Sequence, residues 1–149
     1  MMKAKGHKAR LGLALAALAA VALLPGSATS AYISSSRVDW PKGTVILEAK
    51  LDLGAAGIRL PSGRLEAERL LDTAAPSLAM QTVLHINLDS YRSVNDALTD
   101  GSLGIADLNA YLDTWVRSAP VLSKDGSSIS AVYEWSLPKL AALFVRHSV

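Results

Sequence analysis

From Thr44 to Leu53 the sequence alternates between polar and apolar side chains, and this alternation limits what the chain can fold into. Successive side chains of a strand point to opposite faces, so a period of two places the apolar residues on one face. Turn residues flank the segment, with Pro41 before it and Gly54 after it. The pattern predicts a half-buried strand whose buried face consists of Val45, Leu47, Ala49, Leu51 and Leu53.

Two later segments repeat this period of two. The first runs from Val83 to Tyr91 and the second from Ile129 to Leu137. Each predicts a further strand, and residues 123–128 have the composition of a loop before the last one. The predicted apolar faces are Leu84, Ile86 and Leu88 in the first segment, and Ile129, Ala131, Tyr133, Trp135 and Leu137 in the second.

Three other segments have helical spacing. The first follows Ser62, which can cap a helix, and Pro76 predicts either a kink or a second short helix. The second ends before Pro120, and the third opens at Pro138, because proline suits a first helical turn. The first helix would face solvent with Arg64, Glu66, Glu68, Arg69 and Asp72. The predicted buried stripes are Leu65, Leu70, Leu71, Ala74 and Leu78; then Ile105, Leu108, Leu112 and Trp115, flanked by Tyr111; then Leu140, Ala141, Leu143 and Phe144.

The predicted order is strand, helix, strand, helix, strand, helix. Strands of a parallel three-layer sheet usually read as continuous apolar runs, whereas these strands alternate. We therefore predict an α+β fold, a small two-layer domain with its helices on one face of the sheet. The other face would be solvated or covered by something else. No internal repeat divides the chain, so we expect residues 32–149 to form one domain.

Residues 1–31 have the features of a cleavable signal peptide. Four basic residues precede an uncharged apolar run from Leu11 to Leu24, and a Pro-Gly break and small residues follow it. The run has 14 residues, fewer than a membrane-spanning helix needs, so a retained anchor is the weaker alternative. The small residues favour cleavage after Ala31, with Ala28 as the alternative site. We expect export to the periplasm or cell envelope, with no stable membrane anchor after cleavage.

Removal of this segment changes the charge of the protein. The whole chain has 15 Lys and Arg against 13 Asp and Glu, but four of the basic residues lie within residues 1–31. The exported part, with 11 basic and 13 acidic residues, therefore carries a formal charge of −2. The basic balance of the precursor belongs to the targeting segment, and we expect no nucleic-acid partner.

The exported part contains few side chains suited to catalysis. The chain has no cysteine, and only His85 and His147 lie beyond the signal peptide. His85 and Asp89 would share one face of the predicted strand, while Ser90 points to the other face. Ser90 as a nucleophile would therefore lie out of reach of His85 as its base. No glycine-rich phosphate loop is present. We predict that the protein is not an enzyme, and we assign no catalytic or cofactor-binding residue and no cofactor.

The alternative function is a calcium- or ligand-binding module that uses residues 96–107. Asp96, Asp100 and Asp107 stand at positions one, five and twelve of a twelve-residue calcium loop. Leu98 stands at position three, where an oxygen ligand is expected, and the last ligand is Asp in place of a bidentate Glu. We therefore favour a helix entry with an Asp-Gly turn, and no bound metal, over a calcium loop.

A family resemblance covers about half of the exported part. Its motifs are Gly63-Arg64, Ala67-Glu68, Leu71, Leu88-Asp89-Ser90, Val94, Asp96, Lys124-Asp125 and Val132-Tyr133. With them the chain resembles the N-terminal domain of flagellar assembly protein T and related membrane-associated lipoproteins of diderm bacteria. The resemblance implies an exported α+β domain that binds partners or supports an envelope structure, and it carries over no active-site residue. The chain lacks a cysteine for lipidation, which argues against direct membrane anchorage.

These observations predict a non-enzymatic periplasmic or envelope domain that acts through contacts with an envelope protein. Aromatic residues are candidates for such contacts. Trp115 and Trp135 fall on predicted core stripes, where packing is the commoner role, whereas Trp40 lies outside them.

Overall fold

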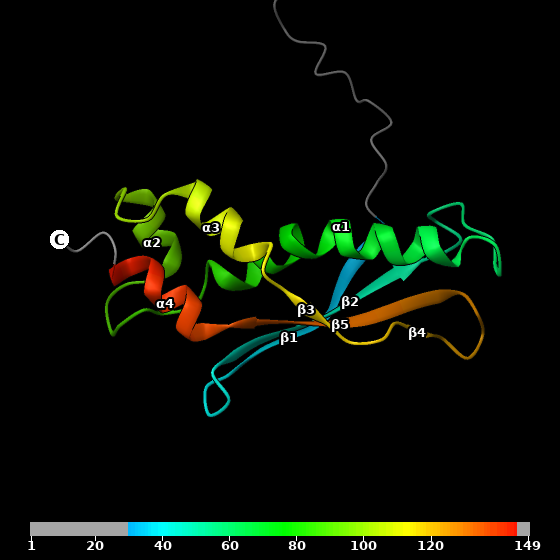
Figure 1. Cartoon of the computed structure of the whole chain (residues 1–149), viewed down its shortest axis with the longest axis horizontal. Coiled ribbons are helices and arrows are strands. Elements are labelled where there is room, and N and C mark those ends of the chain that lie inside the picture. Colours follow the sequence, from blue (N-terminus) through cyan, green and yellow to red (C-terminus); the bar gives the residue numbers. More distant parts are fainter. Residues whose placement is uncertain (1–29, 146–149) are drawn as a thin grey trace, which may run out of the picture.

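A computed structural model describes residues 30–145, which form an α+β domain with helices on one side of an antiparallel sheet (Figure 1). The five-stranded sheet has the order β1-β2-β5-β3, and β4 also pairs with β5. The predicted α+β class is confirmed, whereas the order of the elements differs from strict alternation. Almost all of the predicted signal peptide lies outside the described residues. The elements are β1 (Ala31–Asp39), β2 (Thr44–Asp52), α1 (Arg64–Val83), α2 (Val94–Thr99), α3 (Ile105–Leu112), β3 (Val116–Arg117), β4 (Val121–Leu122), β5 (Ser128–Ser136) and α4 (Leu137–Val145).

The central strands β2 and β5 bury the face that the alternation predicts. Leu47 pairs with Tyr133 and Leu51 pairs with Ile129, and all four side chains are buried. Paired residues of antiparallel strands share a face, so the two apolar rows form one continuous floor for the core. Both strands predicted at these positions are confirmed to within a residue at each end.

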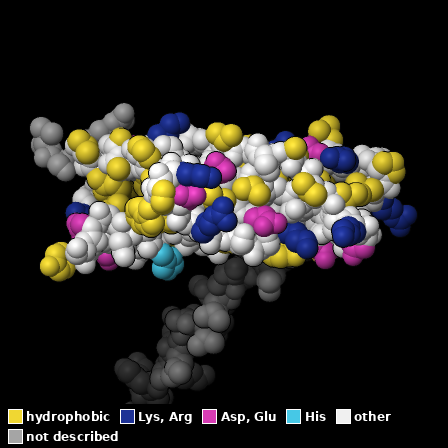
Figure 2. Space-filling view, turned by 90° about the horizontal axis from the view of Figure 1, so that it is seen from below, with side chains coloured by type: hydrophobic (Ala, Val, Ile, Leu, Met, Phe, Trp, Pro, Cys, Tyr) yellow, Lys and Arg dark blue, Asp and Glu magenta, His cyan; other side chains and the backbone are white. Residues whose placement is uncertain are grey.

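The opposite face of the sheet is open to solvent. On β2, half-buried Ile46, Glu48 and Lys50 alternate with the fully buried residues. Seen from below, from the sheet side of Figure 1, hydrophobic side chains are interspersed with charged ones (Figure 2). One face of the sheet therefore carries the helices and the core, and the other has a mixed surface.

The edge strand β1 was not predicted, because its centre is a run of three serines without an apolar period. It pairs antiparallel with β2 along its whole length, with a bulge between Ile33 and Ser35. The Ser34 hydroxyl donates a hydrogen bond to the Glu48 carbonyl oxygen at 3.2 Å. This strand forms through its pairing with β2. The sequence of residues 31–39 has no alternation that would predict it.

The long helix α1 continues through Pro76 to Val83, so no second helix begins there. It starts after Gly63, and no side chain caps it, which corrects the predicted cap at Ser62. A Cβ on Gly63 would lie 2.8 Å from the Arg59 carbonyl oxygen, so the turn into the helix requires glycine. Packing against the sheet offsets the cost of an internal proline, and the buried residues are Ala67, Leu71, Ala74, Ala75, Ala79 and Val83.

The predicted strand from Val83 to Tyr91 is wrong. Its first residue ends α1, and its remaining residues form turns with a single isolated bridge between Asn87 and Ser93. Ile86 is buried, so the apolar residues of this segment do contribute to the core. A short alternating run is ambiguous when a helix can extend into it.

The helices α2, α3 and α4 lie together at the end of the domain where α1 ends (Figure 1). In α3, Leu108, Tyr111 and Leu112 are buried as predicted, but Ile105 is 56% exposed. The helix ends at Leu112, so Trp115 lies beyond it. The buried Trp135 indole donates its Nε1–H to the Leu112 carbonyl oxygen at 2.8 Å, satisfying one of the carbonyls that a helix end leaves free.

The terminal helix α4 is confirmed near Pro138. It packs against α3. Leu140 is buried, while Leu143 and Phe144 pack partly against the core. Ala141 is exposed, which corrects its predicted place on the buried stripe.

Candidate functional site

A groove of about 590 Å³ lies between α1 and the beginning of β1. Its volume is within the range of small binding sites in proteins. One side is a face of α1, the floor includes Leu51 of β2, and the turn after β2 closes the other side. The lining residues are Ser30, Ala31, Leu51, Ala55, Ala56, Leu70, Thr73, Ala74, Ser77, Leu78 and Gln81.

None of the described side chains that line the groove is charged. On α1 this property extends beyond the groove, because no Asp, Glu, Lys or Arg occurs from Thr73 to Val83. Nevertheless Thr73, Ser77 and Gln81 on this stretch are exposed. A solvated helix face normally carries charges, whereas the centre of a protein interface is depleted of them. The groove is therefore the candidate contact site.

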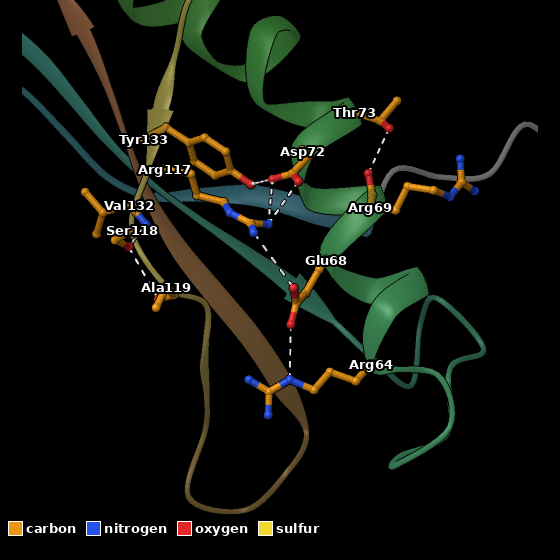
Figure 3. A network of polar contacts seen from close by, with 10 residues as sticks. All are labelled: Arg64, Glu68, Arg69, Asp72, Thr73, Arg117, Ser118, Ala119, Val132 and Tyr133. Carbon is orange, nitrogen blue, oxygen red and sulfur yellow. Dashed lines mark hydrogen bonds and ion pairs between the residues drawn. The ribbon is translucent and has the colours of Figure 1, made fainter.

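A polar network holds the other side of α1 against β3 and β5 (Figure 3). Asp72 accepts two hydrogen bonds from Nη1 of Arg117, both at 2.9 Å, and one from the Tyr133 hydroxyl at 2.7 Å. Glu68 bridges Arg64, at 3.1 Å, and Arg117, at 3.8 Å. Glu68 and Asp72 were expected to face solvent, so the structure corrects that expectation. The network fixes the rotation of α1, which leaves the uncharged face toward the groove.

Burial raises the pKa of Tyr133, and its hydrogen bond to Asp72 adds to the effect. The phenol therefore remains a hydrogen-bond donor across the physiological range. Trp115 packs edge-on against the same ring, with centroids 5.2 Å apart and planes at 84°. This arrangement explains why Trp115 is half-buried although it lies beyond the end of α3.

The three aspartates of the alternative calcium loop do not lie on one loop. Asp96 belongs to α2 and Asp107 to α3, with Asp100 directly after α2. The Asp96 carboxylate accepts the Ser93 backbone N–H at 2.8 Å in a capping box, and this bond lowers its pKa. Asp100 pairs with Arg92 at 2.6 Å, and hydrogen bonds from Ser102 lower its pKa.

Among residues 30–145 no group of three His, Cys, Asp or Glu side chains is placed to hold a metal ion. The Asp96 and Asp100 carboxylates are instead engaged in local hydrogen bonds. The Asp96 contacts form the capping box of α2, and calcium binding by the segment stays a hypothesis to be tested.

The other candidate side chains are dispersed. His85 lies just beyond the end of α1, with Nδ1 2.7 Å from the Gln81 carbonyl oxygen. Asp89 accepts the Tyr91 backbone N–H at 2.7 Å in the following turn. His147 lies outside the described residues. Trp40 is 62% exposed in the turn between β1 and β2, whereas Trp135 is buried.

Sequence reasoning missed the groove, although one signal was available. Residues 73–88 contain no charged side chain, which is unusual for a helix predicted to be amphipathic. The uncharged run does not predict the rest of the groove lining, because Ala31, Leu51 and Ala55 come from segments distant in sequence.

Comparison with known proteins identifies the family. Residues 32–143 match the family described as Treponema pallidum Tp0624, N-terminal domain. The match provides no link to flagellar assembly protein T. No curated protein matches the chain significantly. No helix in residues 30–145 is both long enough and apolar enough to cross a membrane. The matched segment spans most of the sequence, so the chain belongs to the family of the Treponema pallidum Tp0624 N-terminal domain.

Proposed function

We propose that this protein is an exported, non-enzymatic envelope domain that acts through protein–protein contacts at the groove beside α1. The observation that carries the proposal is the uncharged, partly exposed face of α1 from Thr73 to Gln81. Uncharged surface with a concave shape matches the composition of interface centres. Glu66 and Arg69, which precede this face on α1, pair with each other at 2.7 Å.

Export is the second part of the proposal. The basic residues, the apolar run and the small residues of 1–31 support it, and so does the resemblance to envelope proteins related to flagellar assembly protein T. A cysteine-free domain can fold after export without disulfide formation, because its core is formed by packing alone.

Site-directed photo-cross-linking in the producing cell tests the contact site. We would place the photoreactive residue at Ser77 in the groove and, as the matched control, at Tyr91, which is 97% exposed in a distant turn. We expect a discrete cross-linked product from Ser77 and none from Tyr91. If both positions gave only the uncross-linked chain, or if both gave the same products, the groove would not be a contact site.

A further inference from the structure

We propose that the tip of the β1–β2 hairpin is a docking site for an anionic lipid surface. This surface is separate from the groove beside α1, so the inference goes beyond the proposed function. Such a contact would hold the exported protein reversibly at a membrane surface after removal of its signal peptide. The hairpin tip consists of the turn between the two strands and the start of α4, with the residues Trp40, Pro41, Lys42, Gly43, Pro138 and Lys139.

The two segments of the hairpin tip are in direct contact. The Gly43 carbonyl oxygen accepts the Leu137 backbone N–H at 2.8 Å. A Cβ on Gly43 would lie 3.5 Å from Cδ of Pro138, so the turn packs against the start of α4. Lys42 and Lys139 each adjoin a residue of this contact in the sequence. The hairpin tip is therefore one continuous surface, and its turn projects from the sheet on the side away from α1 (Figure 1).

The side chains of the hairpin tip combine an aromatic ring with cations. Trp40 is 62% exposed, and Lys42 and Lys139 are exposed as well. Trp is enriched where an apolar environment meets water, because its ring is apolar while its N–H needs a polar partner. Lys can lay its apolar stem along such a boundary while its ammonium group stays with polar groups. This combination matches the boundary between acyl chains and anionic headgroups.

The same composition argues against a protein as the occupant of the hairpin tip. Lys is depleted at protein interfaces, whereas each Lys or Arg close to an anionic membrane strengthens binding to it. The hairpin tip also projects, whereas the groove beside α1 is concave and its described lining is uncharged. The two surfaces therefore suit different partners.

The local charge of the hairpin tip is positive, although the exported part carries a formal charge of −2. At physiological salt the Debye length is about 8 Å, so the charges close to the lipid decide binding. Asp39, directly before the turn, accepts the Lys42 backbone N–H at 3.0 Å and is the one carboxylate set against two ammonium groups. Further along the sheet, Arg37 and Glu134 both pair with Ile46, and their charges offset each other.

Vesicle flotation of the exported protein, produced from its full-length sequence, tests the proposal. The probe is a vesicle of phosphatidylcholine and phosphatidylglycerol, and a vesicle of phosphatidylcholine alone is the uncharged reference. We expect binding to the anionic vesicle that weakens at high salt, and a blue shift of tryptophan fluorescence as Trp40 leaves water. Equal binding to both vesicles, or binding to neither, would overturn the proposal.

Substitutions locate the binding on the domain. Trp40→Ala should abolish the blue shift and weaken binding about tenfold, and Lys42→Gln and Lys139→Gln should each weaken it about fivefold. Tyr91→Ala is the matched control, because Tyr91 is an aromatic residue that is 97% exposed in another turn, and it should bind as the wild type does. All four side chains are exposed, so the melting temperatures should stay unchanged.

Two results would contradict this assignment. If Trp40→Ala bound as tightly as the wild type, or if Tyr91→Ala lost as much binding, the hairpin tip would not be the docking site. If a photoreactive residue at Trp40 cross-linked to a protein in cells while the purified chain bound no vesicle, the hairpin tip would be a protein contact and the lipid proposal would fail. Neither result bears on the groove, which the cross-linking at Ser77 tests separately.

Discussion

The hydroxyl of Tyr133 donates a hydrogen bond to the carboxylate of Asp72 at 2.7 Å, across 61 residues of sequence. The bond joins the centre of β5 to the middle of α1, and Arg117 of β3 completes the contact from the edge of the sheet. The helix therefore has one side held by charge-assisted bonds and the other side left uncharged along the groove. The position of the candidate contact site thus depends on a network that does not touch it.

Replacement of Asp72 should destabilise the domain. Asp72→Ala would leave the hydroxyl of the buried Tyr133 without its partner and would leave the Arg117 guanidinium only the longer contact with Glu68, at a cost of about 1 to 3 kcal/mol. Glu66→Ala on the same helix is the control, because its ion pair with Arg69 is exposed and screened by solvent, so its loss should cost much less. Urea unfolding measures both values. Equal effects would show that the network contributes no more than a surface pair.

Two leucines of α1 should differ sharply when truncated. Leu71 is fully buried, so Leu71→Ala should cost about 2 to 5 kcal/mol through lost transfer energy and the cavity that remains. Leu65 is 79% exposed, although its spacing predicts burial, and Leu65→Ala should change stability by less than about 0.5 kcal/mol. Thermal and urea unfolding of the two variants check this contrast. A large loss in Leu65→Ala would mean that its environment in solution is buried.

Asp125 should titrate far below an ordinary aspartate. Its carboxylate accepts hydrogen bonds from the hydroxyl of Ser123 at 2.7 Å and from the backbone and hydroxyl of Ser127, which lower its pKa from 3.8 to about 2. A depressed pKa means that the ionised carboxylate stabilises the fold above pH 3.8 and that this contribution is lost as the pH falls to about 2.

Carboxyl NMR measures the titration of Asp125 directly. Ser123→Ala removes the strongest of these hydrogen bonds and should raise the pKa of Asp125 toward 3.8. An unperturbed pKa in the wild type would show that the turn between β4 and β5 does not form these bonds.

Calcium at millimolar concentration should leave the melting temperature unchanged. An ion raises it only by binding the folded state preferentially, and Asp96 and Asp100 already accept hydrogen bonds from Ser93 and Ser102. Differential scanning fluorimetry with and without a chelator checks this result. A rise of several degrees that Asp100→Ala abolishes would instead favour the calcium-binding alternative.

From the proposed export we predict that the mature chain begins at Thr29, which corresponds to cleavage after Ala28. The Ser30 carbonyl oxygen accepts the Asp52 N–H at 3.1 Å, and Ala31 is only 6% exposed as the first residue of β1. Cleavage after Ala31, the site that the small residues alone favour, would remove both contacts. Intact mass spectrometry of the protein from the envelope fraction distinguishes the two ends. A mass that retains Met1 would indicate an uncleaved anchor.

Local pattern determined a large part of this fold. The alternation around Leu47 and Tyr133 predicted β2 and β5, because every second side chain of a half-buried strand is apolar. The polar loop before β5 and the helix near Pro138 follow from turn and helix-start chemistry in the same way. These elements share one property, which is that residues close in sequence carry the whole signal.

Tertiary structure decided the rest. Strand β1 has three central serines and forms because β2 offers it a partner. Packing on the sheet carries α1 through Pro76 into the segment that alternation predicted as a strand. The inward side of α1 is set by Arg117 and Tyr133, so Asp72 is paired and Leu65 is exposed, against the periodic pattern. The groove likewise exists only because β1, the turn after β2 and α1 meet there. Contacts between such distant residues produce no periodic pattern in the sequence of either partner.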